Sequence, residues 1–104
     1  MDLDDLNLFV RIARLDSISA AARDLNITPA TASARLSAFE KRLGARLLHR
    51  TTRHATLTED GRAFLPHAEN VLDAAVAARA ALGREQASPR GTLRIAAPSS
   101  FARM

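Results

Sequence analysis

A chain of 104 residues can form one small domain, or one domain and the beginning of a second, around a modest core. The absence of cysteine excludes disulfide frameworks, thiolate zinc sites and thiol nucleophiles, and a core without tryptophan or tyrosine favours closely packed helices over a β-sandwich. The formal net charge of +4 is concentrated in residues 35–53, where six Lys or Arg stand against Glu40 alone, which is compatible with a phosphate-binding surface or with a solvated basic face.

The N-terminal stretch MDLDDLNLF is acidic and lacks the basic start and apolar centre of a signal peptide. No run reaches the length of a membrane span, so we expect a cytoplasmic protein with no membrane partner. Asp2 can cap a first helical turn, with Asp5 three residues further on. The following apolar residues repeat at helical spacing and predict an amphipathic helix over 3–14: Leu6, Phe9, Val10 and Ala13.

Two further helices are predicted around a tight connection. The first follows Ser17 and is expected to end near Asn26, because asparagine tolerates the left-handed cap conformation. The second spans 29–43, with Thr28 as N-cap, Pro29 in the first helical position and Gly44 as its stop. Two helices joined so closely are typical of a helix-turn-helix. The buried stripe of helix 29–43 is expected to comprise Ala32, Leu36, Phe39 and Leu43.

Residues 47–57 break the helical period and predict a short β-hairpin, or wing, with a basic tip from Arg50 to His54. Thr58 is expected to cap a long helix over 59–83 whose first turn is acidic. Pro66 is expected to bend this helix locally without breaking it. Six of its residues have the alternating spacing of a coiled-coil seam along which two copies could pair: Phe64, Ala68, Val71, Ala75, Ala78 and Leu82.

The C-terminal part of the sequence predicts a hinge followed by the start of a second domain. Residues 84–91 are rich in Gly, Ser, Pro and charge and are interpreted as a hinge. Residues 92–104 begin with a strand-like run, TLRIAAP, and are interpreted as the start of a truncated second domain. The expected organisation is therefore mostly α, with a winged helix-turn-helix of three helices and a two-stranded wing in 1–58, followed by a dimerisation helix in 59–83.

Helix 29–43 carries short side chains opposite its buried stripe. Short side chains let a helix axis approach a DNA major groove, where Ser and Thr hydroxyls and Ala methyl groups can contact base edges, and the positive helix end would face phosphate. An isolated stripe of this kind is better explained by packing against another helix, but the tight turn and the basic hairpin favour DNA. The candidate contacts are Thr28, Pro29, Ala30, Thr31, Ser33, Ala34, Arg35 and Ser37, with Lys41 on the same face.

The wing adds Arg50, Thr51 and Arg53 as candidate DNA contacts. The two arginines could enter a minor groove or hold backbone phosphates, and phosphate contact is the favoured role. Arg42 and Arg46 are equally compatible with a contact to DNA and with a solvated helix end near Gly44.

No enzyme is predicted. His67 and Glu69 are two residues apart and so point to different sides of a helix, which leaves no metal-ligand set. The sequence also has no glycine-rich phosphate loop and no activated-nucleophile pattern. All three histidines, His49, His54 and His67, are interpreted as surface or phosphate-adjacent residues.

Five short patterns occur in a specific order between residues 21 and 61. They are Ala21-Ala22 with Leu25, Thr28-Pro29 with Ser33, the run from Leu36 to Leu43-Gly44, Arg46-Leu47-Leu48 followed by Arg50-Thr51, and Leu57-Thr58-Glu59 with Gly61. In these residues the chain resembles the LysR-type transcriptional regulators. The resemblance implies a winged helix-turn-helix whose third helix reads DNA, a linker helix that dimerises, and an effector domain resembling periplasmic binding proteins.

The resemblance also implies a function and its partners. The expected protein is a sequence-specific regulator that binds double-stranded DNA, at an interrupted-palindrome operator, as a homodimer or a higher oligomer such as a tetramer. A small-molecule effector is expected for the full-length protein, and no cofactor for this fragment. Many members carry a long polar or basic residue after the recognition serine, whereas this chain has Ala34 and then Arg35. The alternative function is a winged-helix module for protein–protein assembly.

Overall fold

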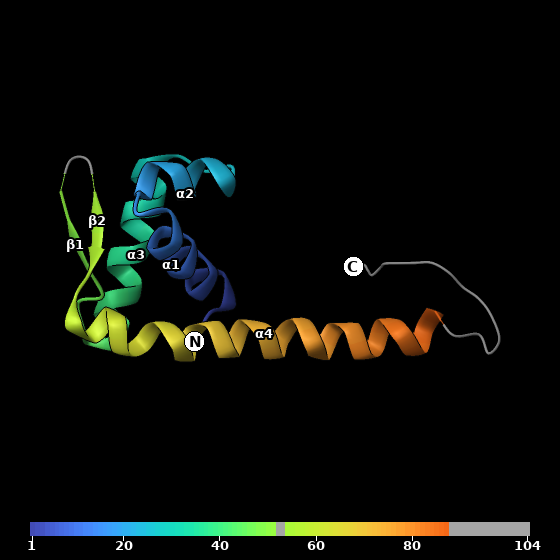
Figure 1. The fold of residues 1–104 in the computed structure, drawn as a ribbon. Coiled ribbons are helices and arrows are strands. Elements are labelled where there is room, and N and C mark those ends of the chain that lie inside the picture. Colours follow the sequence, from blue (N-terminus) through green and yellow to red (C-terminus); the bar gives the residue numbers. More distant parts are fainter. Residues whose placement is uncertain (52–53, 88–104) are drawn as a thin grey trace. The chain divides into compact units, whose positions relative to one another are not determined.

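The computed structural model describes residues 1–51 and 54–87, which form a mostly helical fold with one small antiparallel sheet (Figure 1). The helices and strands in these residues are α1 (Leu3–Leu15), α2 (Ile18–Asp24), α3 (Pro29–Leu43), β1 (Leu48–Arg50), β2 (Ala55–Leu57) and α4 (Glu59–Ala87). One compact unit comprises Met1–Leu72, and the remainder of α4 belongs to a second unit. The predicted fold class, three helices and a wing followed by a long helix, is confirmed.

Each of the first three helices begins at a side-chain cap. Asp2 accepts a hydrogen bond from the backbone N–H of Asp4 (2.9 Å), and Ser17 caps α2 in the same way through the N–H of Ala20 (3.0 Å). Each cap satisfies a backbone donor that has no partner within the helix. Asp2 is thus a cap as predicted, but Asp5 has no part in capping, because its carboxylate lies under α3 and accepts from two arginines there.

The predicted boundaries of the helix-turn-helix are also confirmed. Asn26 adopts a left-handed conformation (φ 62°) directly after α2 and turns the chain toward α3. Thr28 caps α3, Pro29 occupies its first turn, and Gly44 ends it with a φ of 73°. A residue with a Cβ atom rarely adopts such a positive φ, which explains why the helix stops at a glycine.

The core of the first unit lies where α1, α2 and α3 pack on one another. Its largest fully buried side chains come from α1, α3 and the entry to β1: Leu6, Leu8, Phe9, Ile12, Leu36, Phe39, Leu47 and Leu48. The ring of Phe64, from the first part of α4, lies 5.6 Å from that of Phe9 and 6.3 Å from that of Phe39, measured between centroids. Tilted aromatic pairs at this separation are favourable, so the start of α4 is part of the core.

The wing is a two-stranded hairpin beside α3 (Figure 1). Its antiparallel register pairs Leu48 with Leu57 and Arg50 with Ala55, so that Leu48 and Ala55 are buried while His49 and Thr56 face outward. The tip contains residues 52–53, so the predicted DNA contact Arg53 lies outside the described residues.

Helix α4 extends further than predicted. It continues through Pro66 without a break and ends at Ala87, whereas the sequence predicted an end at 83 and a hinge from 84. Gly83 alone does not end it, because the four residues that follow, Arg-Glu-Gln-Ala, are all strong helix formers. The rest of the predicted hinge and the strand at 92–98 lie outside the described residues. Among the described helices, none is long and apolar enough to cross a membrane.

Candidate nucleic-acid interface

The N-terminal half of α3 presents an exposed face of short side chains. Ala30, Thr31 and Ala34 are exposed and Ser33 is partly exposed, whereas Ala32, on the opposite side of the helix, is fully buried. Thr28 and Pro29, at the helix start, are exposed as well, and Ser37 is partly exposed. The structure therefore brings most of the predicted contacts of α3 together on one accessible surface.

The first turn of α3 fixes two hydroxyl groups. The Thr28 hydroxyl oxygen accepts from the backbone N–H of Thr31 (3.1 Å), and the same hydroxyl donates to the Thr31 oxygen (2.8 Å). Because the Thr31 hydroxyl accepts here, its own proton remains available to an acceptor in the solvent or on a ligand. The helix start thus presents an oriented donor beside the positive end of the helix dipole.

Arg35 has a partner within the domain. Its guanidinium lies 3.3 Å from the carboxylate of Asp5 in α1, and Arg42 approaches the other oxygen of the same carboxylate at 2.6 Å. The Asp5 side chain is only 7% exposed, so both arginines serve to compensate a nearly buried charge. This role of Asp5 was missed from the sequence, although Asp5 occupies a helical register with the buried residues Leu8 and Phe9.

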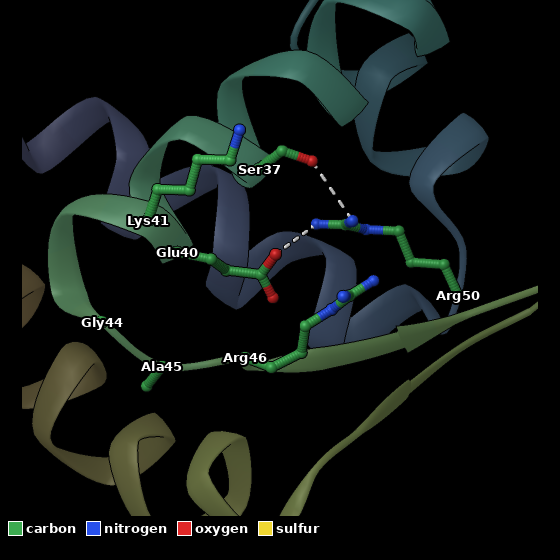
Figure 2. A pocket seen from close by; sticks show the side chains of 7 residues that line it. All are labelled: Ser37, Glu40, Lys41, Gly44, Ala45, Arg46 and Arg50. Carbon is green, nitrogen blue, oxygen red and sulfur yellow. Dashed lines mark hydrogen bonds and ion pairs between the residues drawn. The ribbon is translucent and has the colours of Figure 1, made fainter.

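Arg50 likewise lies against the protein. Its guanidinium donates to the Glu40 carboxylate (2.6 Å) and to the Ser37 hydroxyl (3.2 Å), and its side chain is 17% exposed (Figure 2). The second carboxylate oxygen of Glu40 accepts from the backbone N–H groups of Leu47 (2.7 Å) and Leu48 (3.1 Å). Glu40 and Arg50 therefore join α3 to the first strand of the wing. Sequence reasoning assigned Arg50 to DNA and missed Glu40, whose signal is its position four residues after the buried Leu36.

We expect Glu40→Gln to lower the free energy of unfolding by about 2 kcal/mol, because it leaves Arg50 without its counter-charge in a mostly buried place. Glu69→Gln is the matched control. Glu69 forms a longer pair with Arg14 (3.4 Å) at the surface, so its change should cost less than about 0.5 kcal/mol. Urea unfolding followed by circular dichroism measures both values, and equal losses would show that the Glu40 pair has no special weight.

The predicted dimer seam divides into two parts. Ala68 is 1% exposed and Phe64 packs on the aromatic core, so these two side chains contact their own domain and Ala68 has no surface left for a second copy. The seam positions further along α4 keep accessible surface: Val71 (43% exposed), Ala75, Ala78 and Leu82 (61% exposed). In the first part of α4 the spacing correctly predicted an apolar face that is covered by protein. That face packs on the core of the same chain and not on a second copy.

The remaining polar candidates lie at the surface. Thr51, at the end of β1, is exposed, and its hydroxyl accepts from the N–H of His54 (2.9 Å) and donates to the carbonyl of His54 (3.1 Å), which closes the wing. His49, His54 and His67 are exposed. Within the described part of the chain, no three His, Asp or Glu residues lie close enough together to hold a metal ion.

Three packed helices, an accessible third helix and a hairpin beside it define a winged helix-turn-helix protein. Residues 3–62 match the family model for the bacterial regulatory helix-turn-helix protein, lysR family. The chain belongs to the LysR family.

The curated relatives are named as regulators. An HTH-type transcriptional regulator of Xanthomonas campestris pv. campestris is 41% identical over 100 residues, which cover 96% of this chain and 29% of the relative. The regulator DmlR of Escherichia coli K12 is 36% identical over 101 residues, covering 97% of this chain and 33% of DmlR. The chain thus spans about a third of the length of these relatives.

Solved structures with the same fold include two in complex with DNA. The CbnR_DBD–DNA complex superposes with a TM-score of 0.72 at 31% identity, covering 86% of this chain and 99% of that one. The BenM_DBD complex with benA site 1 DNA gives a TM-score of 0.74 at 28% identity, covering 79% of this chain and 95% of that one.

Proposed function

We propose that this chain is the DNA-binding part of a sequence-specific transcription regulator, with α3 in the major groove of double-stranded DNA and the wing along the adjacent backbone. The observation that carries the proposal is the accessible face of α3, where Ala30, Thr31 and Ala34 are exposed beside a capped, positive helix start. A helix whose long side chains are absent from one face can bring its backbone close to base edges. The DNA complexes of the similar BenM and CbnR domains support the same use of the fold.

Within this proposal the candidate contacts have different roles. The Thr31 and Ser33 hydroxyls and the Ala30 and Ala34 methyl groups contact base edges, and Pro29 adds an apolar contact beside them. Thr28, Thr51 and Arg53 hold the phosphate backbone. Arg35 and Arg50 act mainly by holding α3 against α1 and the wing, given their ion pairs with Asp5 and Glu40. Base recognition therefore depends on small side chains and on the shape of the site more than on long bidentate ones.

The whole protein is proposed to act as a dimer or tetramer in the bacterial cytoplasm, at an operator with an interrupted palindrome, and to respond to a small-molecule effector bound by a domain beyond α4. The oxidised and H₂O₂-bound OxyR structures of Corynebacterium glutamicum, which match 78% and 71% of this chain, support a chemical signal as the input. No enzymatic activity is proposed, since the curated relatives are named as regulators.

The test is binding of the 104-residue chain to a pool of random duplexes, followed by fluorescence anisotropy on the enriched sequence and on a scrambled duplex at several salt concentrations. We expect enrichment of a site with two related half-sites and a steep fall in affinity as salt rises, because phosphate contacts release counterions. Failure to enrich any sequence, together with salt-independent association with a protein, would instead support the assembly module, whose interface would be the same short face of α3.

We expect the double variant Val71→Glu and Ala75→Glu to convert a dimer into a monomer, because like charges would then face each other along the seam. Multi-angle light scattering measures the mass. Ala77→Glu, on an exposed position of α4 outside the seam spacing, is the control and should leave the dimer intact. A double variant that stays dimeric would show that α4 pairs through other residues.

A further inference from the structure

A cleft of about 310 Å³ lies between the C-terminal end of α3 and the base of the wing (Figure 2). Ser37, Glu40 and Lys41 line it from α3, and Arg46 and Arg50 line it from the wing side. Three cationic side chains and one carboxylate therefore line a space large enough for a tetrahedral anion. A cleft with walls of one charge concentrates counter-ions of the opposite charge.

The charges in this cleft are not balanced within the described part of the chain. The Glu40 carboxylate already accepts from Arg50 and from two backbone N–H groups. Its negative charge therefore compensates the positive charge of Arg50 alone. The side chains of Lys41 and Arg46 make no hydrogen bond or ion pair with any described residue, and both residues are exposed. The backbone of Arg46 is fixed, because its carbonyl accepts from the Thr58 hydroxyl at 2.6 Å. Two cationic side chains without a partner among the described residues thus line the cleft.

The cleft also continues the accessible face of α3. Ser37 and Lys41 follow Ala30 and Ala34 at helical spacing, so the hollow lies at the far end of the surface assigned to the major groove. The Ser37 hydroxyl accepts from Arg50 and keeps its own proton for another acceptor. A helix in a groove is flanked by backbone phosphates, to which about half or more of all protein–DNA hydrogen bonds are made.

We propose that this cleft binds one backbone phosphodiester of the DNA, with Lys41 and Arg46 supplying the charge, Ser37 donating a hydrogen bond, and Arg50 positioning Ser37. The inference deepens the proposed function and rests on it. It assigns a phosphate contact to Lys41, which the sequence places only on the candidate DNA-binding face of α3, and to Arg46, which the charge pattern alone leaves equally compatible with a solvated helix end.

The experiment measures the salt dependence of DNA binding for the double variant Lys41→Gln and Arg46→Gln. We expect the slope of log affinity against log salt to fall by about 0.9, the value for one neutralised phosphate, with a similar loss of affinity on every sequence. Lys41→Arg with Arg46 intact should retain the wild-type slope. Arg14→Gln removes one positive charge from an exposed position on α1, away from the cleft, and should also leave the slope unchanged. An unchanged slope in the double variant would overturn the inference, and thermal melting checks that both exposed substitutions leave the fold intact.

A set of duplexes with single methylphosphonate linkages identifies the phosphate. The wild-type chain should lose affinity at one neutral linkage beside each half-site, and the double variant should be insensitive at that same linkage. Equal sensitivity of the two proteins at every linkage would contradict the inference. If inorganic phosphate raises the melting temperature of the wild type alone while the DNA slopes agree, the cleft binds free anions and the DNA assignment is wrong. Absence of DNA binding by the wild type would instead refute the proposed function itself.

Discussion

Gly61→Ala should destabilise the domain by about 3 kcal/mol, although alanine normally stabilises a helix relative to glycine by about 1 kcal/mol. Gly61 lies in the first turn of α4, directly against the entry to the wing. A Cβ atom built there would collide with the backbone carbonyl oxygen of Leu47, and it would lie 3.0 Å from the carbonyl carbon and 3.1 Å from a methyl group of Leu57. The opposing group is backbone, so no side-chain rotation relieves the collision.

The cost is large because the surroundings of Gly61 are fixed on both sides. Its N–H donates to the Thr58 hydroxyl (2.9 Å), the Thr58 N–H donates to the Leu47 carbonyl (3.0 Å), and the Thr58 hydroxyl donates to the Arg46 carbonyl (2.6 Å). To admit a methyl group, α4 must move away from β1 and break this set of bonds. Thermal and urea unfolding followed by circular dichroism measure the loss.

Gly83→Ala is the matched control for this prediction. Gly83 lies in the same helix, and a Cβ atom there would meet no heavy atom of the described residues within 4 Å. The substitution should therefore leave the stability unchanged or raise it slightly, as alanine does in an open helix position. If both substitutions had the same effect, close approach of the backbones at Gly61 would not be the cause.

The sequence predicted those features of the fold that are decided locally. The predicted caps Asp2 and Thr28 and the stop at Gly44 act within one or two turns, so their types and spacing sufficed to place α1 and α3. The capping role of Ser17 was not predicted, although α2 was expected to follow it. The wing followed from the interruption of the helical period between residues 47 and 57. The end of α4 was misplaced because a single glycine was given more weight than the helix-forming residues that follow it.

The ion pairs could not be predicted, because each joins residues that the chain brings together only after folding. Asp5 and Arg42 are 37 positions apart, and Glu40 and Arg50 are 10 apart across a turn and a strand. The sequence shows that residues 35–53 contain six basic residues and one acidic residue. It does not show which of the basic side chains form ion pairs with acidic ones. For the same reason the sequence did not show that Arg50 pairs with Glu40, whereas the side chains of Lys41 and Arg46 have no partner among the described residues.

The sequence also did not show that the apolar seam of α4 is buried in its first part and exposed further along. A coiled-coil spacing states that one face of a helix is apolar, and it does not state which surface covers that face. Phe64 is covered by Phe9 and Phe39 of the same chain. Val71 and Leu82 follow the same spacing and remain exposed, so a second copy is the partner we propose for them.

Ser33→Leu and Ala34→Leu should each abolish sequence-specific DNA binding while the melting temperature stays within a few degrees of the wild type. Both positions lie on the accessible face of α3, where leucine is a good helix former and should alter stability by only about 0.5 kcal/mol. A leucine side chain would hold the helix away from the floor of a major groove. Ser33→Leu also removes a hydroxyl, and each lost base contact costs about 1–3 kcal/mol of discrimination.

Ala63→Leu provides the control, because Ala63 is exposed in the first part of α4 and outside α3. It introduces the same side chain on a helical surface and should change neither the melting temperature nor the affinity for the enriched duplex. Fluorescence anisotropy and thermal melting are measured on all three variants in the same buffer. A collapse of the melting temperature for Ser33→Leu or Ala34→Leu would mean that the short face of α3 is buried against protein in solution. Retained binding with retained stability would mean that α3 does not enter the groove by this face, since no duplex could approach it closely past a leucine.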